Sequence, residues 1–443
     1  MDYAALAAQW AVETPEKAAV IANGRLYTYA DLDSLAERYA ENLRKQAGAG
    51  RGTLLIVRRR PLEQMTAFLG AEKAGFVPVL GHPDLTQQMA FELARVRGIG
   101  WVDTGFLEPA APETRDLSRV CMGVLSSGTT GLPKLMYRTY ESWADFFFEQ
   151  NRIFGTGPDT VAFIEGSMSF TGNLNVWACL LASGATLVVS DGIRPRSWAR
   201  AIAQYGVTCV YLVPVKLKLF LRSVTAAFPK VRTVMAGSQL LDEGTARALK
   251  HTFPRSEIFL YYGASELDYI TSLTYEELLA HPGSVGRPCR GVRVFLQDGL
   301  IYVSTPYHVE GLPQPCTLGD AGHWDRDGYL IFEGRRGQIV NKGGLTISCT
   351  RVEEALLRLP AVSDAVVLAI SDGQRGQDMA AFVILKEERN AAQLRQALRE
   401  TLLPSELPKV FVRLTEFPLN AAGKIDTKAL LAKAGRVAGQ DGM

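Results

Sequence analysis

A nine-residue segment rich in glycine and hydroxyl side chains reads Ser126-Ser127-Gly128-Thr129-Thr130-Gly131-Leu132-Pro133-Lys134. Apolar residues lie on both sides of it, at 121–125 and at 135–137. Glycine lets a backbone turn tightly and brings its N–H groups close to a ligand. The hydroxyls and the lysine supply hydrogen-bond donors and a positive charge for phosphate oxygens. The segment therefore predicts a loop that holds a nucleoside triphosphate.

Two other interpretations of this segment compete with that one. A cluster of Gly, Ser and Thr is also typical of an ordinary surface turn, and the segment alone leaves this open. The common P-loop needs Gly-Lys followed directly by Ser or Thr, with a helix opening on the phosphate. Here Pro133 precedes Lys134, Leu135 follows it, and the next residues indicate a strand. The P-loop interpretation therefore fails.

Length and composition indicate a multidomain globular protein. A chain of 443 residues is too long for one ordinary core, so two or three domains are expected. The 48 basic and 46 acidic residues leave a net charge of +2, so nothing calls for a nucleic-acid partner. The six cysteines are scattered without C-x-x-C spacing, which is typical of reduced thiols in a cytosolic protein rather than of a disulfide frame or zinc site.

The chain shows no signal for a membrane or an export pathway. Its N-terminus lacks a basic region followed by an apolar core, so no signal peptide is expected. The longest apolar run, 176–189, is interrupted by Ser183-Gly184 and is shorter than the ~20 residues that a membrane span needs. We expect a cytoplasmic protein without a membrane partner.

Strand and helix patterns alternate over the first 280 residues or so. Strands are expected at 53–57, 77–80, 186–190, 208–213, 231–236 and 258–262, and helices at 29–46, 61–73, 196–205 and 216–227. This alternation predicts an α/β fold with largely parallel sheets covered by helices.

The pattern of expected secondary structure changes after Gly283. Short strands are expected at 283–298 and 299–305, and Asp327-Gly328 predicts a hairpin turn. A smaller α+β unit follows, with helices expected at 352–359 and 392–403 and strands at 365–370 and 380–385. We place the domain boundary at Arg336, between residues 1–336 and 337–443.

Four later segments add to the phosphate loop. Residues 261–266 (Tyr-Tyr-Gly-Ala-Ser-Glu) follow a strand and offer an aromatic ring, a hydroxyl and a carboxylate, as a nucleotide–Mg²⁺ site needs. Residues 317–320 end in Asp320, whose carboxylate can accept hydrogen bonds from both ribose hydroxyls. Gly334-Arg335 lies at the domain junction, and residues 418–426 place Lys424 on a glycine-containing turn.

In this order and spacing, the segments resemble the adenylate-forming superfamily of acyl- and aryl-CoA synthetases, peptide-synthetase adenylation domains and firefly-type luciferases. The resemblance covers about residues 5–431. It implies a large N-terminal adenylation core, 1–336, of helix-covered, mostly parallel sheets plus a small β-barrel-like part, which binds ATP and acid. It also implies a small mobile α+β C-terminal domain, 337–443, that carries the catalytic lysine.

The resemblance also implies roles for single residues. The nucleotide site would comprise Ser126, Ser127, Gly128, Thr129, Thr130, Gly131, Lys134, Tyr262, Ser265, Asp320 and Arg335. Among these, Thr129, Thr130 and Lys134 would hold the β- and γ-phosphates. Tyr262 would stack on adenine, and Ser265 would reach the α-phosphate. Asp320 would hold the ribose, with Arg335 nearby.

The implied catalytic residues are Lys424, Glu266 and Thr130, and the implied cofactors are ATP and Mg²⁺. Glu266 would bind the metal, and Lys424 would bridge the carboxylate substrate and the α-phosphate. A carboxylate is a poor electrophile, so its oxygen attacks the α-phosphorus of ATP, giving an acyl-adenylate and pyrophosphate. The transition state gathers negative charge, which a metal ion and a well-placed cation stabilise.

One departure from the family concerns the hinge. Family members usually carry Asp or Lys two residues after the junction arginine, and this chain has Gly337 there. Glycine widens the allowed backbone angles, so a hinge remains compatible with the sequence. Gln338 and Asn341 stand at positions that are often charged in the family.

The expected acid pocket lies around residues 168–173 (Met-Ser-Phe-Thr-Gly-Asn). Amino-acid-activating relatives place an Asp where this chain has Thr171. An unpaired buried ammonium is very costly, so an aryl or small acyl acid is expected. The pocket candidates are Phe170, Thr171, Tyr211, Pro214, Met235, Gly237, Ser238 and Gly263. Ser238 and Asn175 are also candidates to bind a hydroxylated ring, or else to satisfy backbone groups.

The second step implied by the resemblance is transfer to a pantetheine thiol as a thioester, with Gly343 and Gly344 lining the thiol tunnel. The acceptor is free CoA or a pantetheinylated acyl carrier protein, and the sequence leaves both open. An alternative is a stand-alone adenylation enzyme that loads an amino acid or aryl acid onto a carrier protein in natural-product or siderophore biosynthesis. A luciferase-like oxidation and a catalytically silent nucleotide-binding protein are further alternatives.

Overall fold

The chain divides into two units. The first comprises Met1–Val294 and Val303–Cys316, and the second comprises Phe295–Tyr302 and Thr317–Met443. The computed structural model describes residues 2–47, 52–112, 115–126, 133–335, 339–342, 345–372, 376–402, 404–420 and 424–438. The predicted boundary at Arg336 lies outside the described residues and remains a prediction.

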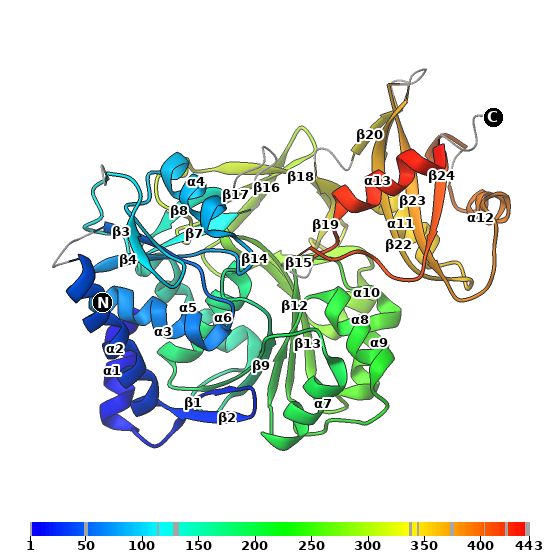
Figure 1. The fold of residues 1–443 in the computed structure, drawn as a ribbon. Coiled ribbons are helices and arrows are strands. Elements are labelled where there is room, and N and C mark those ends of the chain that lie inside the picture. Colours follow the sequence, from blue (N-terminus) through cyan, green and yellow to red (C-terminus); the bar gives the residue numbers. More distant parts are fainter. Residues whose placement is uncertain are drawn as a thin grey trace. The chain divides into compact units, whose positions relative to one another are not determined.

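A large mixed sheet runs through the first unit (Figure 1). Its parallel strands are neighbours in the order β13-β12-β11-β9-β10-β1, and antiparallel strands extend it, with β2 beside β1 and β14-β15 beside β13. The bounds are β1 (Ala18–Ala22), β2 (Arg25–Thr28), β9 (Val161–Glu165), β10 (Thr186–Ser190), β11 (Cys209–Tyr211), β12 (Thr233–Gly237), β13 (Glu257–Ala264), β14 (Asp268–Leu273) and β15 (Ser284–Pro288).

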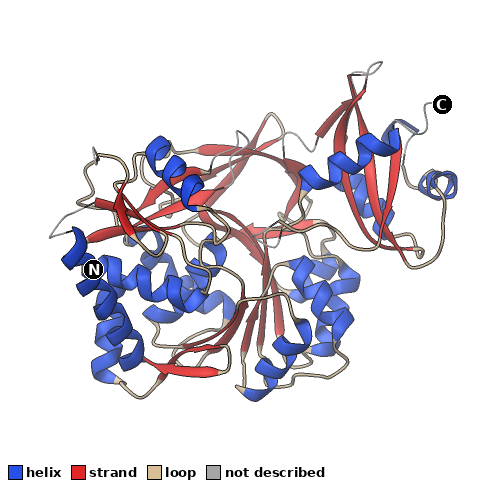
Figure 2. Ribbon diagram, in the orientation of Figure 1, coloured by secondary structure: helices blue, strands red, loops and turns tan. Residues whose placement is uncertain are grey.

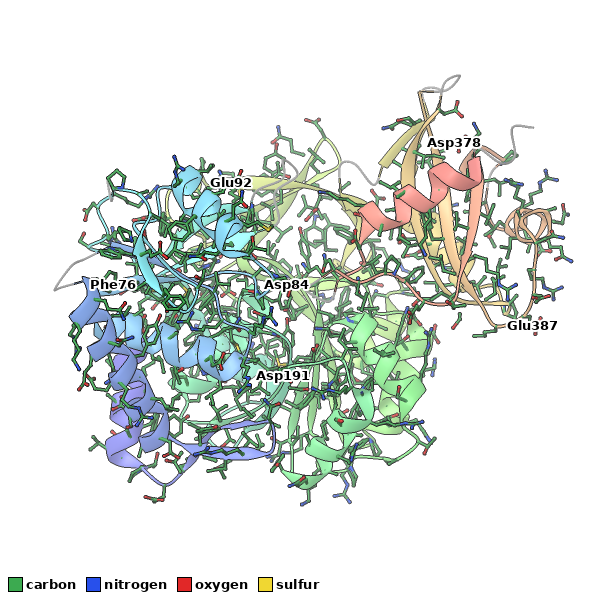
Figure 3. The ribbon with its side chains drawn as sticks, in the orientation of Figure 1. Phe76, Asp84, Glu92, Asp191, Asp378 and Glu387 are labelled. Carbon is green, nitrogen blue, oxygen red and sulfur yellow. The ribbon has the colours of Figure 1, made fainter. Side chains whose placement is uncertain are left out.

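A second sheet of the first unit has the strand order β6-β5-β3-β4-β7-β8. Its inner strands are parallel, and β6 and β8 are antiparallel edges. Phe76, labelled in Figure 3, sets its ring edge-on to that of Trp101, with centroids 6.3 Å apart. The bounds are β3 (Gly52–Ile56), β4 (Phe76–Leu80), β5 (Trp101–Asp103), β6 (Leu107–Pro109), β7 (Met122–Ser126) and β8 (Lys134–Arg138).

Helices cover the sheets of this unit, as the alternating pattern predicts (Figure 2). They are α1 (Tyr3–Glu13), α2 (Tyr29–Ala47), α3 (Pro61–Lys73), α4 (Gln87–Arg97), α5 (Glu141–Phe154), α6 (Thr171–Ala182), α7 (Pro195–Gln204), α8 (Pro214–Ser223), α9 (Glu243–Thr252) and α10 (Tyr275–Ala280). Helix α3 matches its predicted bounds, with proline in its first turn and Gly75 at φ +86° just after it. The helix predicted at 216–227 instead begins at Pro214, whose missing N–H suits a first turn, and ends at Ser223.

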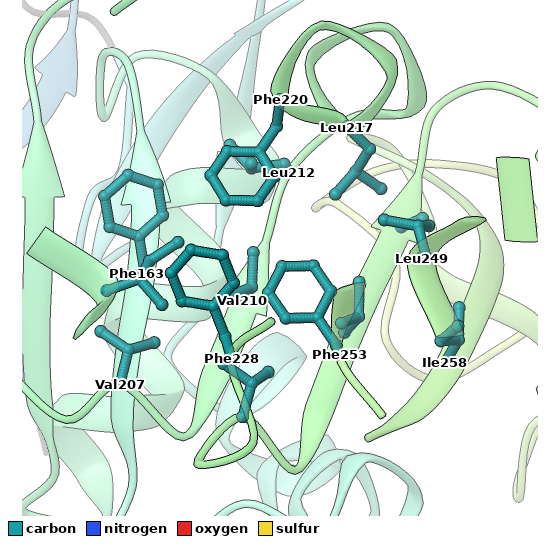
Figure 4. Packing of buried hydrophobic residues seen from close by; sticks show 14 of the residues in the cluster. Phe163, Val207, Val210, Leu212, Leu217, Phe220, Phe228, Leu249, Phe253 and Ile258 are labelled. Carbon is teal, nitrogen blue, oxygen red and sulfur yellow. The ribbon is translucent and has the colours of Figure 1, made fainter. Parts of the chain in front are cut away.

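The two faces of strand β13 show how the large sheet is packed. Ile258 and Leu260 join a cluster of buried residues with α7, α8, α9 and α10. In that cluster Phe220 and Phe253 stack with ring centroids 5.8 Å apart (Figure 4). Side chains alternate along a strand, so Tyr261 points to the opposite face, where its ring lies 6.3 Å from that of Phe154 in α5. The sheet is therefore buried on both faces, which agrees with the predicted parallel arrangement.

The remaining elements lie wholly or mostly in the second unit. Strands β16 to β19 are consecutive neighbours, and a further sheet has the order β21-β20-β23-β22 with β24 parallel to β23. The region predicted as one strand at 283–298 is two strands, β15 and β16, because Gly291 between them takes φ +82°. The bounds are β16 (Arg293–Gln297), β17 (Leu300–Ser304), β18 (Cys316–Trp324), β19 (Leu330–Arg335), β20 (Ile339–Lys342), β21 (Leu345–Ser348), β22 (Val362–Asp372), β23 (Gly376–Leu385), β24 (Val410–Leu414), α11 (Cys349–Leu357), α12 (Ala391–Leu398), η1 (Pro404–Glu406) and α13 (Thr427–Ala438).

The six cysteines are all free thiols. Within the described ranges, we find no helix with the length and apolar character required to cross a membrane.

Candidate active site

The glycine-rich segment joins two antiparallel strands. Ser126, the last residue of β7, pairs with Lys134, the first residue of β8. The expected strand after the loop is therefore present. Lys134 is exposed, and Arg97 at the end of α4 donates from Nε to the carbonyl oxygen of Pro133 at 2.7 Å, which fixes the end of the loop. The remaining predicted loop residues lie outside the described part of the chain: Ser127, Gly128, Thr129, Thr130 and Gly131.

Strand β8 ends on a fully buried arginine, Arg138. Its Nη1 donates to the carbonyl oxygen of Tyr307 at 3.1 Å and to the hydroxyl of Ser142 at 3.2 Å. Its Nη2 donates to the carbonyl oxygen of Ser265 at 2.8 Å. Its guanidinium carbon lies 5.1 Å from the ring centroid of Trp143. One side chain thus ties β8 and the start of α5 to two distant segments.

The residues predicted to contact the nucleotide follow strand β13. Tyr262 lies in the strand, Ser265 and Glu266 lie in its connection to β14, and all three are half-buried. A Cβ on Gly263 would lie 2.5 Å from the carbonyl oxygen of Asp268, so the chain needs glycine there. The carbonyl oxygen of Glu266 accepts a hydrogen bond from the N–H of Val309 at 2.9 Å. The backbone of this connection is therefore held from more than one side.

Helix α6 makes one side-chain contact with the β13–β14 connection and one with the first residue of β14. The hydroxyl of Ser265 donates to that of Thr171 at 3.0 Å. Asn175, one turn later, donates from Nδ2 to the Asp268 carboxylate at 3.1 Å. Residues four apart on a helix share a face, so α6 presents one polar stripe to the β13–β14 connection. The structure thereby brings together a predicted pocket residue and a predicted nucleotide residue.

Asp268 is a buried carboxylate in this polar cluster. Its backbone takes φ +60°, a left-handed conformation that Asp tolerates better than most residues. Burial raises the pKa of Asp268 to about 7, although Arg138 and the N–H of Tyr269 act to lower it. Its Oδ2 atom has no hydrogen-bond partner among the described residues. Asn175 is also engaged by Gln150, which donates to it at 3.0 Å, so this candidate for binding an acid serves the protein's own polar network.

Two tyrosines fill the space among the other pocket candidates. Tyr211 ends β11, Tyr261 lies in β13, and their hydroxyls are 2.9 Å apart in a buried hydrogen bond. A Cβ on Gly172 would lie 2.2 Å from the Tyr211 hydroxyl, and one on Gly237 would lie 2.3 Å from the Tyr261 ring. The glycines thus make room for the tyrosines. Among the remaining candidates, Phe170 precedes α6, Pro214 begins α8, Met235 is buried in β12, and Ser238 is exposed at φ +70°.

Three predicted site residues belong to the second unit. Asp320, which is buried, pairs with Arg335 across strands β18 and β19, so two residues read from separate motifs are neighbours in a ladder. Lys424 is hydrogen-bonded to Asn420: its carbonyl oxygen accepts from the N–H of Asn420 at 2.7 Å, and its N–H donates to the Asn420 side chain at 3.0 Å. An isolated antiparallel bridge also pairs Leu419 with Ile425. The tunnel candidates Gly343 and Gly344, and the hinge positions Gly337 and Gln338, lie outside the described residues.

Sequence reasoning did not single out Arg138, Tyr261 or Asp268. A signal for Arg138 existed, because it ends a strand pattern whose other members are mostly apolar. Asp268 stood two residues from a predicted metal ligand. Neither signal distinguishes a buried group from an exposed one, which depends on the elements packed around it.

Family models match both parts of the chain. The model described as "AMP-binding enzyme" matches residues 7–99 and 88–311, and the model described as "AMP-binding enzyme C-terminal domain" matches residues 351–424.

Curated relatives are similar at low identity. The uncharacterized acyl–CoA ligase YhfT of Bacillus subtilis (strain 168) is 26% identical over 317 residues, covering 68% of this chain and 66% of that protein. Surfactin synthase subunit 2 of the same organism is 25% identical over 501 residues, and phenyloxazoline synthase MbtB of Mycobacterium sp. (strain MCS) is 26% identical over 486 residues. The surfactin synthase subunit aligns with 97% of this chain, which spans 14% of its length. Phenyloxazoline synthase aligns with 96% of this chain, which spans 41% of its length. The chain therefore spans less than two thirds of each of these relatives.

Solved structures share the fold. O-Succinylbenzoate CoA synthetase (MenE) of Bacillus subtilis, in complex with its acyl-adenylate intermediate, superposes with a TM-score of 0.83 at 22% identity over 96% of this chain and 97% of that one. The anthranilate CoA ligase AuaEII, in complex with anthranoyl-AMP, superposes with a TM-score of 0.83 at 19% identity over 98% and 97%. These likenesses agree with the predicted α/β fold class.

Proposed function

This chain belongs to the AMP-binding enzyme family, and from that membership we propose that it activates a carboxylic acid with ATP and then transfers the acyl group to a pantetheine thiol. In the first step an acid oxygen attacks the α-phosphorus, the bond to the bridging oxygen breaks, and pyrophosphate leaves. In the second step the sulfur attacks the acyl carbon, AMP leaves, and the thiol proton passes to solvent.

The hydrogen bond between Ser265 and Thr171 carries this proposal. Ser265 belongs to the proposed nucleotide segment and Thr171 to the proposed acid pocket, and their hydroxyls are 3.0 Å apart. Adenylation requires the acid oxygen and the α-phosphorus to meet in one place. A junction of the two binding regions at hydrogen-bond distance supports that requirement.

We assign the remaining roles as follows. Lys134, with the loop before it, binds the terminal phosphates, and Tyr262 stacks on adenine. Asp320 holds the ribose, with Arg335 nearby. Lys424 binds the acid and the α-phosphate, where a preorganised cation stabilises the developing negative charge. The half-buried carboxylate of Glu266 fits Mg²⁺, which prefers hard oxygen ligands and which, when bound, neutralises charge on the phosphates.

The proposed acid is a small acyl or aryl acid. Thr171 replaces the carboxylate that would pair with a substrate ammonium, and Tyr211 and Tyr261 occupy space beside it. The thiol acceptor is CoA or a carrier protein. YhfT is named an acyl–CoA ligase, which supports CoA. The synthases align with nearly all of this chain, which supports the second candidate, an enzyme that loads a carrier protein. A cytoplasmic location remains a prediction.

A pyrophosphate-exchange screen over aryl, short-chain, fatty and amino acids tests the first step. We expect exchange with aryl or short-chain acids and none with amino acids. Exchange with amino acids alone would contradict the pocket assignment, and no exchange with any acid would contradict the activity. Product analysis with CoA and with a pantetheinylated carrier protein then distinguishes the two acceptors.

A further inference from the structure

A buried arginine contacts the proposed nucleotide segment. We infer that Arg138 is a positioning residue that holds the Ser265–Glu266 segment in place for adenylate formation, an inference that rests on the proposed function. Its Nη2 donates to the carbonyl oxygen of Ser265 at 2.8 Å, so it fixes the backbone next to the hydroxyl and carboxylate assigned to ATP and Mg²⁺.

The same arginine links that segment to a second loop. Its Nη1 donates to the carbonyl oxygen of Tyr307 at 3.1 Å, and two residues later the N–H of Val309 donates to the carbonyl oxygen of Glu266 at 2.9 Å. The N–H of Glu310 then donates to the carbonyl oxygen of Tyr137, the neighbour of Arg138, at 2.8 Å. Strand β8, the loop at 307–310 and the Ser265–Glu266 segment thus form a closed set of hydrogen bonds.

Arg138 suits this task better than a lysine would. Its planar fork offers donors in several fixed directions at once, whereas a lysine offers one ammonium at the end of a flexible stem. The guanidinium is buried, and within the described ranges no carboxylate lies within ion-pair distance of it. Burying an unpaired charge is costly unless its hydrogen bonds are satisfied. Here backbone carbonyls and one hydroxyl accept from Nη1 and Nη2, whereas Nε has no hydrogen-bond partner among the described residues.

Strand β8 also connects the two proposed nucleotide regions directly. Lys134 begins it and Arg138 ends it. Four residues of extended chain span roughly 13 Å, which sets a fixed distance between the phosphate loop and the anchor of the Ser265–Glu266 segment. Arg138 therefore acts on both the backbone that would contact the α-phosphate and the strand that would carry the phosphate loop.

The test compares Arg138→Lys and Arg138→Met with the parent enzyme. Displacement of a catalytic segment by about 1 Å can cost about 100-fold in rate, so we expect kcat/KM for ATP in pyrophosphate exchange to fall by about that factor in Arg138→Lys. Most of the loss should appear in the KM for ATP, and binding of a non-hydrolysable ATP analogue with Mg²⁺, measured by calorimetry, should weaken in parallel.

Tyr29→Phe is the matched control. Tyr29 is buried in the same unit and its hydroxyl donates to the carbonyl oxygen of Ala185 at 2.6 Å, so this variant also removes a buried bond to a carbonyl. It should lose stability but keep the parent KM for ATP. A purely structural role of Arg138 would reduce the active fraction of Arg138→Lys without changing that KM.

A milder variant keeps the inference testable if both Arg138 variants fail to fold. Ser142→Ala removes the hydroxyl that orients Nη1 at 3.2 Å, and loss of one such bond should lower kcat/KM for ATP about fivefold. If folded Arg138→Lys or Ser142→Ala keeps the ATP kinetics and analogue binding within twofold of the parent, the inference is overturned. Absence of exchange by the parent enzyme would instead contradict the proposed function, and analogue binding would still report on Arg138.

Discussion

The hydroxyl of Ser265 donates to that of Thr171 at 3.0 Å, although 94 residues separate them in the chain. If this bond orients Ser265 toward the α-phosphate, Thr171→Val should lower kcat/KM for ATP in pyrophosphate exchange about fivefold, because a neutral hydrogen bond contributes about 1 kcal/mol. Exchange rates of Thr171→Val, Ser265→Ala and the double variant measure the coupling. Fully additive effects would contradict it.

Lys424→Ala should slow adenylate formation by a factor of about 100 to 1,000, the range for loss of one preorganised charge donor. Transfer of an acyl group from a chemically prepared acyl-adenylate to the thiol should change little, because that step does not use this lysine. Lys428 in α13 is exposed and lies in the same segment, so Lys428→Ala is the control and should match the parent. Equal rates of adenylation in Lys424→Ala and the parent would contradict the role.

Tyr261→Ala should widen the range of acids. The Tyr261 ring lies within 2.3 Å of where a Cβ on Gly237 would stand, and its hydroxyl bonds that of Tyr211. In the proposed acid pocket, this pair would limit the depth available to an acid. Removing the ring should raise kcat/KM for bulky aryl acids relative to short acids by about tenfold or more, since a few buried methylene equivalents contribute about 1–3 kcal/mol. Tyr211→Phe keeps the volume and should leave the acid preference unchanged.

The pH dependence of stability should carry a signature of Asp268. Burial raises its pKa to about 7 in the folded protein, against about 3.9 in an unfolded chain. Between these values the folded state binds the extra proton, so this residue makes the free energy of unfolding fall as pH rises from about 4 to about 7, by at most about 1.4 kcal/mol per unit.

Asp268→Asn should remove this contribution. The free energy of unfolding of the variant, relative to that of the parent, should therefore rise up to about pH 7 and then remain constant. Urea denaturation at several pH values measures it. Asp242 provides a control of opposite sign: burial acts to raise its pKa, but Lys218 and the Thr245 hydrogen bonds lower it overall. Asp242→Asn should therefore be less stable to unfolding than the parent at neutral pH, and this difference should disappear at low pH. If the free energy of unfolding of Asp268→Asn changed with pH as steeply as that of the parent, Asp268 would not titrate in this range.

The buried ion pair between Lys216 and Glu165 should show a large coupling free energy in a double-mutant cycle. Lys216 lies in the first turn of α8 and Glu165 ends β9, and both side chains are buried. Lys216→Met alone should destabilise the protein by about 3–5 kcal/mol, because it leaves an unpaired buried carboxylate. Adding Glu165→Leu should recover most of that loss in urea denaturation. If the double variant were as unstable as the sum of the single ones, the pair would not be coupled.

The sequence predicted the elements better than their contacts. Strand β8 after the loop, helix α3 from Pro61 and the mainly parallel strands of the large sheet all follow from local patterns of apolar residues, glycine and proline. The family resemblance also selected Ser265 and Thr171 separately. It did not reveal that they share a hydrogen bond, because that contact depends on how α6 packs on the sheet.

Buried polar groups were the least predictable part. Asn175 was a candidate to bind an acid, yet it bonds Asp268 and Gln150 inside the protein. Tyr261 and Tyr262 are adjacent and chemically alike in sequence, but strand alternation sends them to opposite faces, so one fills the interior and its neighbour is half-buried. A one-residue uncertainty in register exchanges such roles, and only the folded sheet fixes the register.

Strand β8 has a practical consequence for engineering the phosphate loop. Lys134, Met136 and Arg138 share one face of the strand, which passes from exposed to buried along its length. Insertion of a single residue after Lys134 would turn that lysine to the other face or expel the arginine from the interior. Chimeras that exchange this loop with a relative should therefore be joined before Lys134, where added length changes only the loop.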